Sequence, residues 1–217
     1  MQWRANATSG QVIAGGNGQG SGAHQLDRPT DVIVEKDTDS LIICDSRENG
    51  KVVRWLRQNG KNGTMIISNI NCVGLAMDEN RSLYVSDAKK EEVKRFRTGE
   101  SSGSVVAGGN GQADRLNQLY GPTFMFVDQN RTVYVSDSGN HRIMKWIDGA
   151  REGIVVAGGQ GRGNGLQQLV GPQAVAIDQM DTVYVVDAGN NRIMRWPKGA
   201  SQGTVIIGQE GQLNFPV

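Results

Sequence analysis

Short apolar runs separated by polar turns recur along the whole chain in a constant order. A unit begins with a proline-led run such as GPTFMFVD at 121–128, and a β-rich run, TVYVSD at 132–137, follows a polar turn. A basic run, RIMKW at 142–146, and a glycine-flanked run, GIVVAGG at 153–159, close the unit. Runs of this length bounded by Gly, Asn, Asp and Pro predict four strands per unit. No segment keeps a 3.6-residue period, so we expect almost no helix.

The two middle runs of a unit differ in pattern. TVYVSD is apolar on both faces, which predicts a strand buried between sheets that stack face to face. RIMKW alternates apolar and polar residues, which predicts an outer strand with one solvated face.

The unit repeats along the chain. The run that ends in aspartate returns four times, and its aspartates, Asp45, Asp87, Asp137 and Asp187, are spaced 42, 50 and 50 residues apart. Four strands at this period are the signature of a propeller blade. We therefore predict an all-β fold, a β-propeller of four full repeats with partial blades at both ends. Its approximate units are 1–28, 29–71, 72–121, 122–171, 172–215 and 216–217.

The spacing from Asp45 to Asp87 is eight residues shorter than the next spacing, because the second full unit lacks the GGNGQ…QL linker that precedes the others. Cys72 stands there in the position of Pro29, Pro122 and Pro172. The chain has two cysteines, Cys44 and Cys72, a number too small for a disulfide framework. We expect two buried thiols, with a bridge as the alternative.

The order of proline, a VAID-type run, TVYVSD and then GNHRI resembles the NHL repeat, and the resemblance covers essentially the whole chain. It implies a β-propeller, most often of six blades. Similar proteins include lyase and hydrolase propellers with metals or histidines near the central channel. Others are tripartite-motif regulators that bind RNA on a basic face.

The segment DSGNHRIMKW at 137–146 places an aspartate, a histidine and an arginine close together. A catalytic set needs one geometry at one place, but the His141 position holds Gly50, Glu91 and Asn191 in the other units, and the Arg142 position holds Lys51, Glu92 and Arg192. Only the aspartate recurs in all four. We therefore assign Asp45, Asp87, Asp137 and Asp187 to structural turns, as acceptors of backbone N–H groups from the following turn, and predict no catalytic residue. His141→Ala should leave the fold intact, and Asp137→Ala should cost about 1–3 kcal/mol.

We predict neither a cofactor nor a metal site. His24 and His141 lie far apart without a cysteine cluster, and Asp31 is the one acidic residue where the first strands of the units begin. GGNGQGSG at 15–22 leads to a proline-ended linker instead of a helix, so its glycines belong to turns. The net charge of +1 makes nucleic acid an unfavoured partner.

The leading function hypothesis is a non-enzymatic binding or scaffold propeller that contacts a protein or glycan through its loops. The residues assigned to this surface are Arg47, Lys89, Asn140, His141, Asn190 and Asn191. The alternatives are a lyase- or hydrolase-type enzyme with a central metal and an RNA-binding propeller.

Two further features of the sequence bear on the cellular location of the protein. No run is long and apolar enough to span a membrane. The four N-glycosylation sequons begin at Asn6, Asn62, Asn80 and Asn130, and they are explained equally well by turn chemistry and by glycosylation. An extracellular location is therefore slightly favoured over a cytoplasmic one.

The two ends read as parts of blades. Residues 1–16 match 144–159 without gaps, so the chain starts with the last two strands of a unit, and residues 212–216 open a new unit. We expect the 217 residues to be a segment of a longer propeller, or an open arc that another chain completes.

Overall fold

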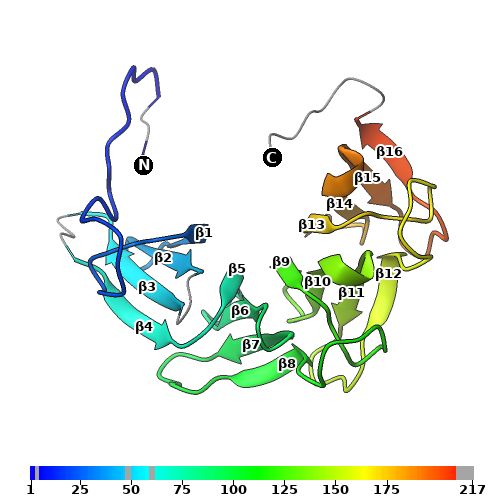
Figure 1. The fold of residues 1–217 in the computed structure, drawn as a ribbon, viewed down its shortest axis with the longest axis horizontal. Helices are drawn as coiled ribbons and strands as arrows, with labels where there is room; N and C mark the ends of the chain where they lie inside the picture. Colours follow the sequence, from blue (N-terminus) through cyan, green and yellow to red (C-terminus); the bar gives the residue numbers. More distant parts are fainter. Residues whose placement is uncertain (3–4, 47–49, 59–61, 209–217) are drawn as a thin grey trace. The chain divides into compact units, whose positions relative to one another are not determined.

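The computed structural model describes residues 1–2, 5–46, 50–58 and 62–208 (Figure 1). Arg47, one of the predicted surface residues, lies outside them. The described residues form sixteen strands and two single-turn 3₁₀ helices, η1 (Ser138–Asn140) and η2 (Ala188–Asn190), so the predicted all-β fold with little helix is confirmed.

The strands form four antiparallel sheets of four, each in sequence order, as predicted for propeller blades. The first sheet holds β1 (Pro29–Glu35), β2 (Ser40–Asp45), β3 (Lys51–Leu56) and β4 (Thr64–Ser68). The second holds β5 (Cys72–Met77), β6 (Leu83–Asp87), β7 (Glu92–Phe96) and β8 (Ser104–Gly108). The third holds β9 (Pro122–Val127), β10 (Val133–Asp137), β11 (Arg142–Trp146) and β12 (Ile154–Gly158). The fourth holds β13 (Pro172–Ile177), β14 (Val183–Asp187), β15 (Arg192–Trp196) and β16 (Thr204–Ile207).

The chain divides into two compact units, Met1–Leu75 and Ala76–Val217. In the first, Leu41, Ile43, Val53 and Trp55 form the core, and Ile13, Ala14 and Leu26 pack against it. The match between residues 1–16 and 144–159 extends to backbone pairing: the Gln2–Gln11 bridge corresponds to the pair Lys145–Ile154. The N-terminal segment therefore has the start of a third-to-fourth-strand hairpin.

In the second unit, cores form between successive sheets. Met125 of β9 packs with Tyr84 and Ala107 of the preceding sheet, and Val175 of β13 packs in the same way with Tyr134 and Ala157. Burial on both faces explains why the middle strands are apolar throughout.

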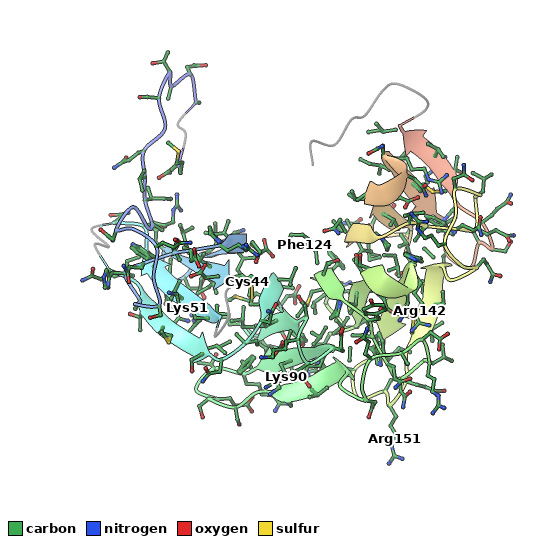
Figure 2. The ribbon with its side chains drawn as sticks, in the orientation of Figure 1. Cys44, Lys51, Lys90, Phe124, Arg142 and Arg151 are labelled. Atoms are coloured by element: carbon green, nitrogen blue, oxygen red, sulfur yellow. A yellow bond between two sulfur atoms is a disulfide. The ribbon has the colours of Figure 1, made fainter. Side chains whose placement is uncertain are left out.

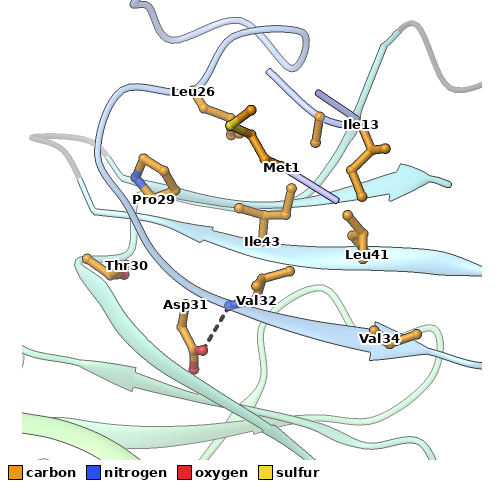
Figure 3. Close-up of a pocket in the computed structure, with 11 residues that line it drawn as sticks. Met1, Ile13, Leu26, Pro29, Thr30, Asp31, Val32, Val34, Leu41 and Ile43 are labelled. Carbon is orange, nitrogen blue, oxygen red and sulfur yellow. Dashed lines mark hydrogen bonds between the residues drawn. The ribbon is translucent and has the colours of Figure 1, made fainter. Parts of the chain in front are cut away.

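The exposed first-strand residues of the first sheet contrast with this packing. Met125 is 7% and Val175 8% exposed, whereas Val32, the residue at the same place in β1, is 54% exposed and Val34 50%. A hollow of about 400 Å³ lies over β1 and is lined by Met1, Ile13 and Leu26 among others (Figure 3). Among the described residues, the β1 face is thus less covered than the equivalent faces of β9 and β13.

The prediction of a half-solvated RIMKW strand was wrong. In β11, Arg142, Ile143, Met144 and Trp146 are buried, and Lys145 is partly exposed. The arginine is buried because a connecting loop folds over it, as described below. The more exposed strand of each sheet is the fourth, for example β8 and β12.

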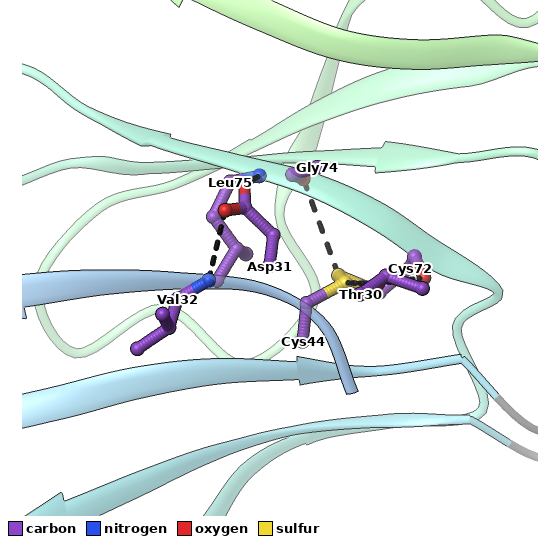
Figure 4. The surroundings of a disulfide bond; sticks show 7 residues. All are labelled: Thr30, Asp31, Val32, Cys44, Cys72, Gly74 and Leu75. Carbon is purple, nitrogen blue, oxygen red and sulfur yellow. Dashed lines mark hydrogen bonds between the residues drawn. A yellow bond between two sulfur atoms is a disulfide. The ribbon is translucent and has the colours of Figure 1, made fainter. Parts of the chain in front are cut away.

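The expectation of two free thiols was also wrong. Cys44 of β2 and Cys72 of β5 form a disulfide, with their Cα atoms 5.6 Å apart (Figure 4). Because Cys72 replaces the proline that starts the other first strands, its side chain meets the end of the second strand of the preceding sheet. Both cysteines are fully buried, and Thr30 Oγ donates to the carbonyl of Cys72 beside them at 3.4 Å.

Candidate functional site: the loop edge of the sheets

Each sheet has one edge where its second strand ends, its third begins and the connection to the next sheet leaves. We call this the loop edge. In the third and fourth sheets it carries η1 and η2 together with the connecting loops 109–121 and 159–171. The first-to-second and third-to-fourth turns lie at the opposite, or turn, edge. The predicted surface residues Lys89, Asn140, His141, Asn190 and Asn191 all belong to the loop edge.

A buried ion pair between Arg142, which Figure 2 labels, and Asp137 holds the loop 109–121 to the third sheet. Arg142 Nε donates to Asp137 Oδ2 at 2.6 Å, and its other nitrogens donate to the carbonyls of Asp114 at 2.7 Å, Arg115 at 3.0 Å and Gln118 at 3.2 Å. Arg142 is 5% exposed and Asp137 fully buried. The guanidinium therefore acts as an internal clamp on the loop.

Asn140 and the loop backbone complete the arrangement around Asp137. The Asn140 side-chain amide donates to Asp137 Oδ2 at 2.9 Å and to the carbonyl of Ala113 at 2.8 Å. The backbone N–H of Tyr120 donates to Asp137 Oδ1 at 2.7 Å. Asp137 thus accepts its backbone bond from the loop that precedes the sheet, whereas we expected the following turn.

The fourth sheet repeats this geometry around Asp187. Arg192 Nε donates to Asp187 Oδ2 at 2.7 Å and its other nitrogens reach three carbonyls of the loop 159–171. Asn190 donates to Asp187 Oδ2 at 2.8 Å, and the Val170 N–H donates to Oδ1 at 2.7 Å. The same set of contacts therefore holds the connecting loop in two sheets.

The first sheet uses a lysine for the same purpose. Lys51 Nζ donates to the carbonyls of Gly20 at 3.1 Å and Gly22 at 2.9 Å, and it lies 3.4 Å from Asp45 Oδ2. Asp45 accepts from the N–H groups of Asp27 and Arg28.

The second sheet has no connecting loop to hold. β4 ends at Ser68 and β5 begins at Cys72, and Glu92 replaces the clamp cation. Asp87 accepts from the N–H groups of Lys89 at 3.1 Å and Lys90 at 3.2 Å, which is the bond from the following turn that the sequence predicted.

The recurrent Gln-Leu pair closes each connecting loop on itself. Gln118 Nε2 donates to the carbonyl of Asn110 at 2.7 Å, and Gln168 Nε2 donates to that of Gln160 at 2.9 Å. The adjacent leucines, Leu119 and Leu169, are fully buried. The sequence showed this pair without revealing its role.

Residue 141 and its equivalent in the preceding sheet link successive sheets. Glu91 Oε2 accepts a hydrogen bond from the N–H of Gly121 at 2.6 Å, and His141 Nδ1 accepts one from Gly171 at 3.1 Å. His141 and Asn191 both have positive φ, 55° and 50°, so the position suits a turn residue. His141 thus has a structural partner.

Burial and neighbouring charges shift the pKa values of three acidic side chains. Burial raises the pKa of Asp137, against the hydrogen bonds from Tyr120, Asn140 and Arg142. Burial also raises the pKa of Glu91, against the Gly121 N–H, and the charges of Asp137 and Asp87 raise it further. In the first unit burial raises the pKa of Asp31, which accepts from the N–H groups of Leu75 at 2.7 Å and Val32 at 2.8 Å (Figure 4).

What remains exposed on the loop edge is a mixture of charged, polar and apolar side chains. Lys89 and Asn191 are exposed, while Asn140, His141 and Asn190 are partly buried. The connecting loops extend from the loop edge to the third-to-fourth turns, where the N–H groups of Gly153 and Gly203 donate to the carbonyls of Leu116 and Leu166 at 2.8 Å. On these loops, Leu116 is 44%, Leu166 45% and Tyr120 44% exposed, and Arg115 and Arg162 are exposed as well. These loop residues were missed from the sequence, where they read as linker.

Among the described residues, no group of three or more His, Cys, Asp or Glu side chains could hold a metal ion. In the same part of the chain, no helix has the length and apolar character needed to cross a membrane. A hollow of about 380 Å³ adjoins the loop 109–121 and is lined by Asn110, Asn117 and Arg151 along with β8.

One unit of the chain matches a known repeat family. Residues 119–146, from the buried Leu119 through the Asp137–Arg142 clamp to the end of β11, match the model of the NHL repeat. The chain carries an NHL repeat. The resemblance stated from the sequence is thereby confirmed for this unit, and the propeller-type fold agrees with it.

Solved structures similar to this chain share its fold at low sequence identity. An auxiliary nutrient binding protein from Bacteroides thetaiotaomicron has a TM-score of 0.69 and 15% identity, over 89% of this chain and 50% of its own. A gluconolactonase from Xanthomonas campestris has a TM-score of 0.67 and 14% identity, over 87% and 65%. The nidogen/laminin complex has a TM-score of 0.56 and 18% identity, over 76% and 61%. The chain therefore spans about half to two thirds of these neighbours, which include both enzymes and binding proteins. No curated protein sequence matches the chain.

Proposed function

We propose that this protein is a non-enzymatic binding module that contacts a protein partner through its loop edge and the connecting loops 109–121 and 159–171. The observation that carries the proposal is the pair of clamped loops, 109–121 and 159–171, which have the same internal bonding in two sheets. Loops fixed in this way present their outer side chains on a rigid support, and little conformational entropy is lost when they bind.

The composition of the exposed loop residues favours a protein as the partner. Tyr120, Leu116 and Leu166 expose apolar surface next to Arg115 and Arg162. Aromatic residues and arginine are enriched in protein–protein interfaces, where they form most of the energetic hot spots. A glycan partner is the competing outcome of the test.

The same geometry weighs against an enzyme. Asp137, Asn140 and Arg142 resemble catalytic residues in the sequence, but their polar atoms form hydrogen bonds with loop carbonyls and with one another. Its position is buried, so a substrate would have to displace the loop to reach it.

The test compares capture of partners by the wild-type chain and by loop-edge variants. Arg115→Glu and Arg162→Glu change exposed side chains on loops that Arg142 and Arg192 still clamp, so the fold should persist. We expect a partner captured by the wild type to be lost with the double variant. Met180→Lys, at a 75% exposed turn-edge residue, is the control and should keep the partner. Equal capture by all three proteins would contradict the proposal.

The chemical class of the captured partner separates the remaining alternatives. A partner that survives glycosidase treatment and is lost on mild proteolysis supports a protein, and the reverse result would overturn that choice. Turnover of a lactone or peptide substrate by purified protein, abolished by a chelator, would instead establish the enzyme hypothesis.

A further inference from the structure

The four glycosylation sequons fall at one kind of place in the fold. Asn80 lies in the turn between β5 and β6, and Asn130 lies at the equivalent place between β9 and β10. Asn62 lies between β3 and β4. Asn6 lies within the N-terminal hairpin closed by the Gln2–Gln11 bridge. All four therefore belong to the turn edge of their own sheet or hairpin, and all four side chains are exposed.

Turn chemistry explains the hydroxyl residues of these sequons better than it explains their asparagines. Asparagines are also frequent at the loop edge, at positions such as Asn110, Asn140, Asn164 and Asn190, but none of these is followed by Ser or Thr two residues later. A hydroxyl residue recurs at this turn in all four sheets, as Ser40, Ser82, Thr132 and Thr182, so the asparagine two residues earlier is what distinguishes positions 80 and 130 from position 180.

The disulfide supplies the second observation. The Cys44–Cys72 bridge is a feature of chains that fold in an oxidising compartment, and such compartments are where N-linked oligosaccharides are attached. The sequence alone left glycosylation and turn chemistry equally open, and the bridge separates them.

We infer that Asn80 and Asn130, and with them the turn edge, carry N-linked oligosaccharides. The donor is an oligosaccharide joined to a polyprenyl diphosphate. The Asn Nδ2 attacks the anomeric carbon, the new C–N bond forms as the C–O bond to the diphosphate breaks, and the amide loses one proton to a base. The lipid diphosphate is the leaving group, and no oxidant or reductant is consumed.

The turn geometry places this transfer before folding is complete. Ser82 and Thr132, the hydroxyl residues of the two sequons, are each 5% exposed, and their N–H groups donate to Asp78 and Asp128 at 2.8 Å. A transferase that reads the hydroxyl therefore reaches the sequon in the nascent chain. The exposed asparagine then leaves the attached sugar in solvent after the turn closes.

The fourth sheet provides a matched control. Its turn has the same bonds, with Thr182 N–H donating to Asp178 Oδ1 at 2.9 Å, but Met180 stands where Asn80 and Asn130 stand. Met180 is 75% exposed. Met180→Asn creates the sequon Asn-Asp-Thr at an equivalent place, so this turn should gain a glycan that the wild type lacks.

The primary experiment uses the protein from its native source. It is digested and treated with peptide N-glycosidase in heavy-oxygen water, which converts each glycosylated asparagine into labelled aspartate. We expect labelled aspartate at Asn80 and Asn130. Recovery of both peptides unlabelled and unmodified would overturn the inference.

Secretory expression of the 217-residue chain behind an added leader tests the placement. Asn80→Gln and Asn130→Gln should each remove one step from the ladder of glycoforms, and Met180→Asn should add one. An Asn80→Gln/Asn130→Gln chain with an unchanged ladder, or a Met180→Asn chain without the extra step, would contradict it. Glycan occupancy is read directly, so this result stands apart from any partner of the loop edge.

Discussion

Arg142→Met is the change that tests the loop clamp most directly. Methionine keeps the length and apolar stem of the side chain but removes every donor, so Asp137 loses its cation while it stays buried. The carbonyls of Asp114, Arg115 and Gln118 lose their shared donor as well. Breaking a buried ion pair from one side costs about 3–5 kcal/mol. We expect a loss of this size in the free energy of unfolding.

This value exceeds the 1–3 kcal/mol that we expected for Asp137→Ala from turn amides alone. The difference arises because the aspartate is one half of an ion pair and not only an acceptor for backbone N–H groups. Urea unfolding at neutral pH measures the loss through the midpoint at constant slope. Hydrogen exchange at the Tyr120 amide reports whether the loop 109–121 is released.

The pH dependence gives the prediction a second readout. Without the guanidinium, burial holds the pKa of Asp137 still further above its unfolded value, so the folded variant keeps a proton that the unfolded chain releases. Its stability is then highest below the unfolded pKa and falls as pH rises through the folded pKa. The deficit relative to wild type should therefore shrink in acid.

Two matched variants test whether the stability loss comes from the clamp. Arg192→Met removes the same clamp from the fourth sheet and should cost a similar amount. Arg151→Met removes an exposed arginine that projects from the ribbon and should cost almost nothing (Figure 2). A loss below about 1 kcal/mol at Arg142, within the range of an exposed pair, would refute the clamp.

Three further outcomes follow from the same structure. Replacing the bridge by Cys44→Ser/Cys72→Ala should lower the free energy of unfolding by about 3–4 kcal/mol, the loop-entropy value for a separation of 28 residues, measured by urea unfolding with and without reductant. Glu91→Gln keeps a hydrogen-bond acceptor and removes a carboxyl group whose pKa is raised in the folded protein. Ionisation of that carboxyl group destabilises the wild type as pH rises, so the variant should have a higher urea midpoint than wild type at pH 7 and the same midpoint in acid. Because Val32 and Val34 are half exposed on β1, the chain alone should associate, and light scattering should show a lower mass for Val32→Lys/Val34→Lys; a wild-type mass equal to the monomer would contradict this.

The sheets could be predicted from the sequence because their signal is local. The run VYVSD fixes β10 through its own residues, and its repetition at 183–187 fixes β14. The burial of Arg142 could not be predicted in the same way. An arginine in an alternating run is ordinarily solvent-facing, and only the loop that folds over it, more than twenty residues earlier in the chain, reverses that expectation. The disulfide was missed for a related reason, since its cysteines lie on successive sheets and nothing local to either reports their distance.

The second sheet, which has no preceding connecting loop, shows that a comparison of the repeats could have revealed the clamp. Where a connecting loop precedes a sheet, the clamp position holds a cation: Lys51, Arg142 or Arg192. Where the loop is missing, the position holds Glu92. A cation there could face Asp87 but would have no loop carbonyls to bind, so its remaining donors would be buried without partners. The loop and the cation are therefore present or absent together. A catalytic role does not explain this association, because a catalytic cation would be needed whether or not a connecting loop is present. A cation that holds the loop is needed only where the loop exists.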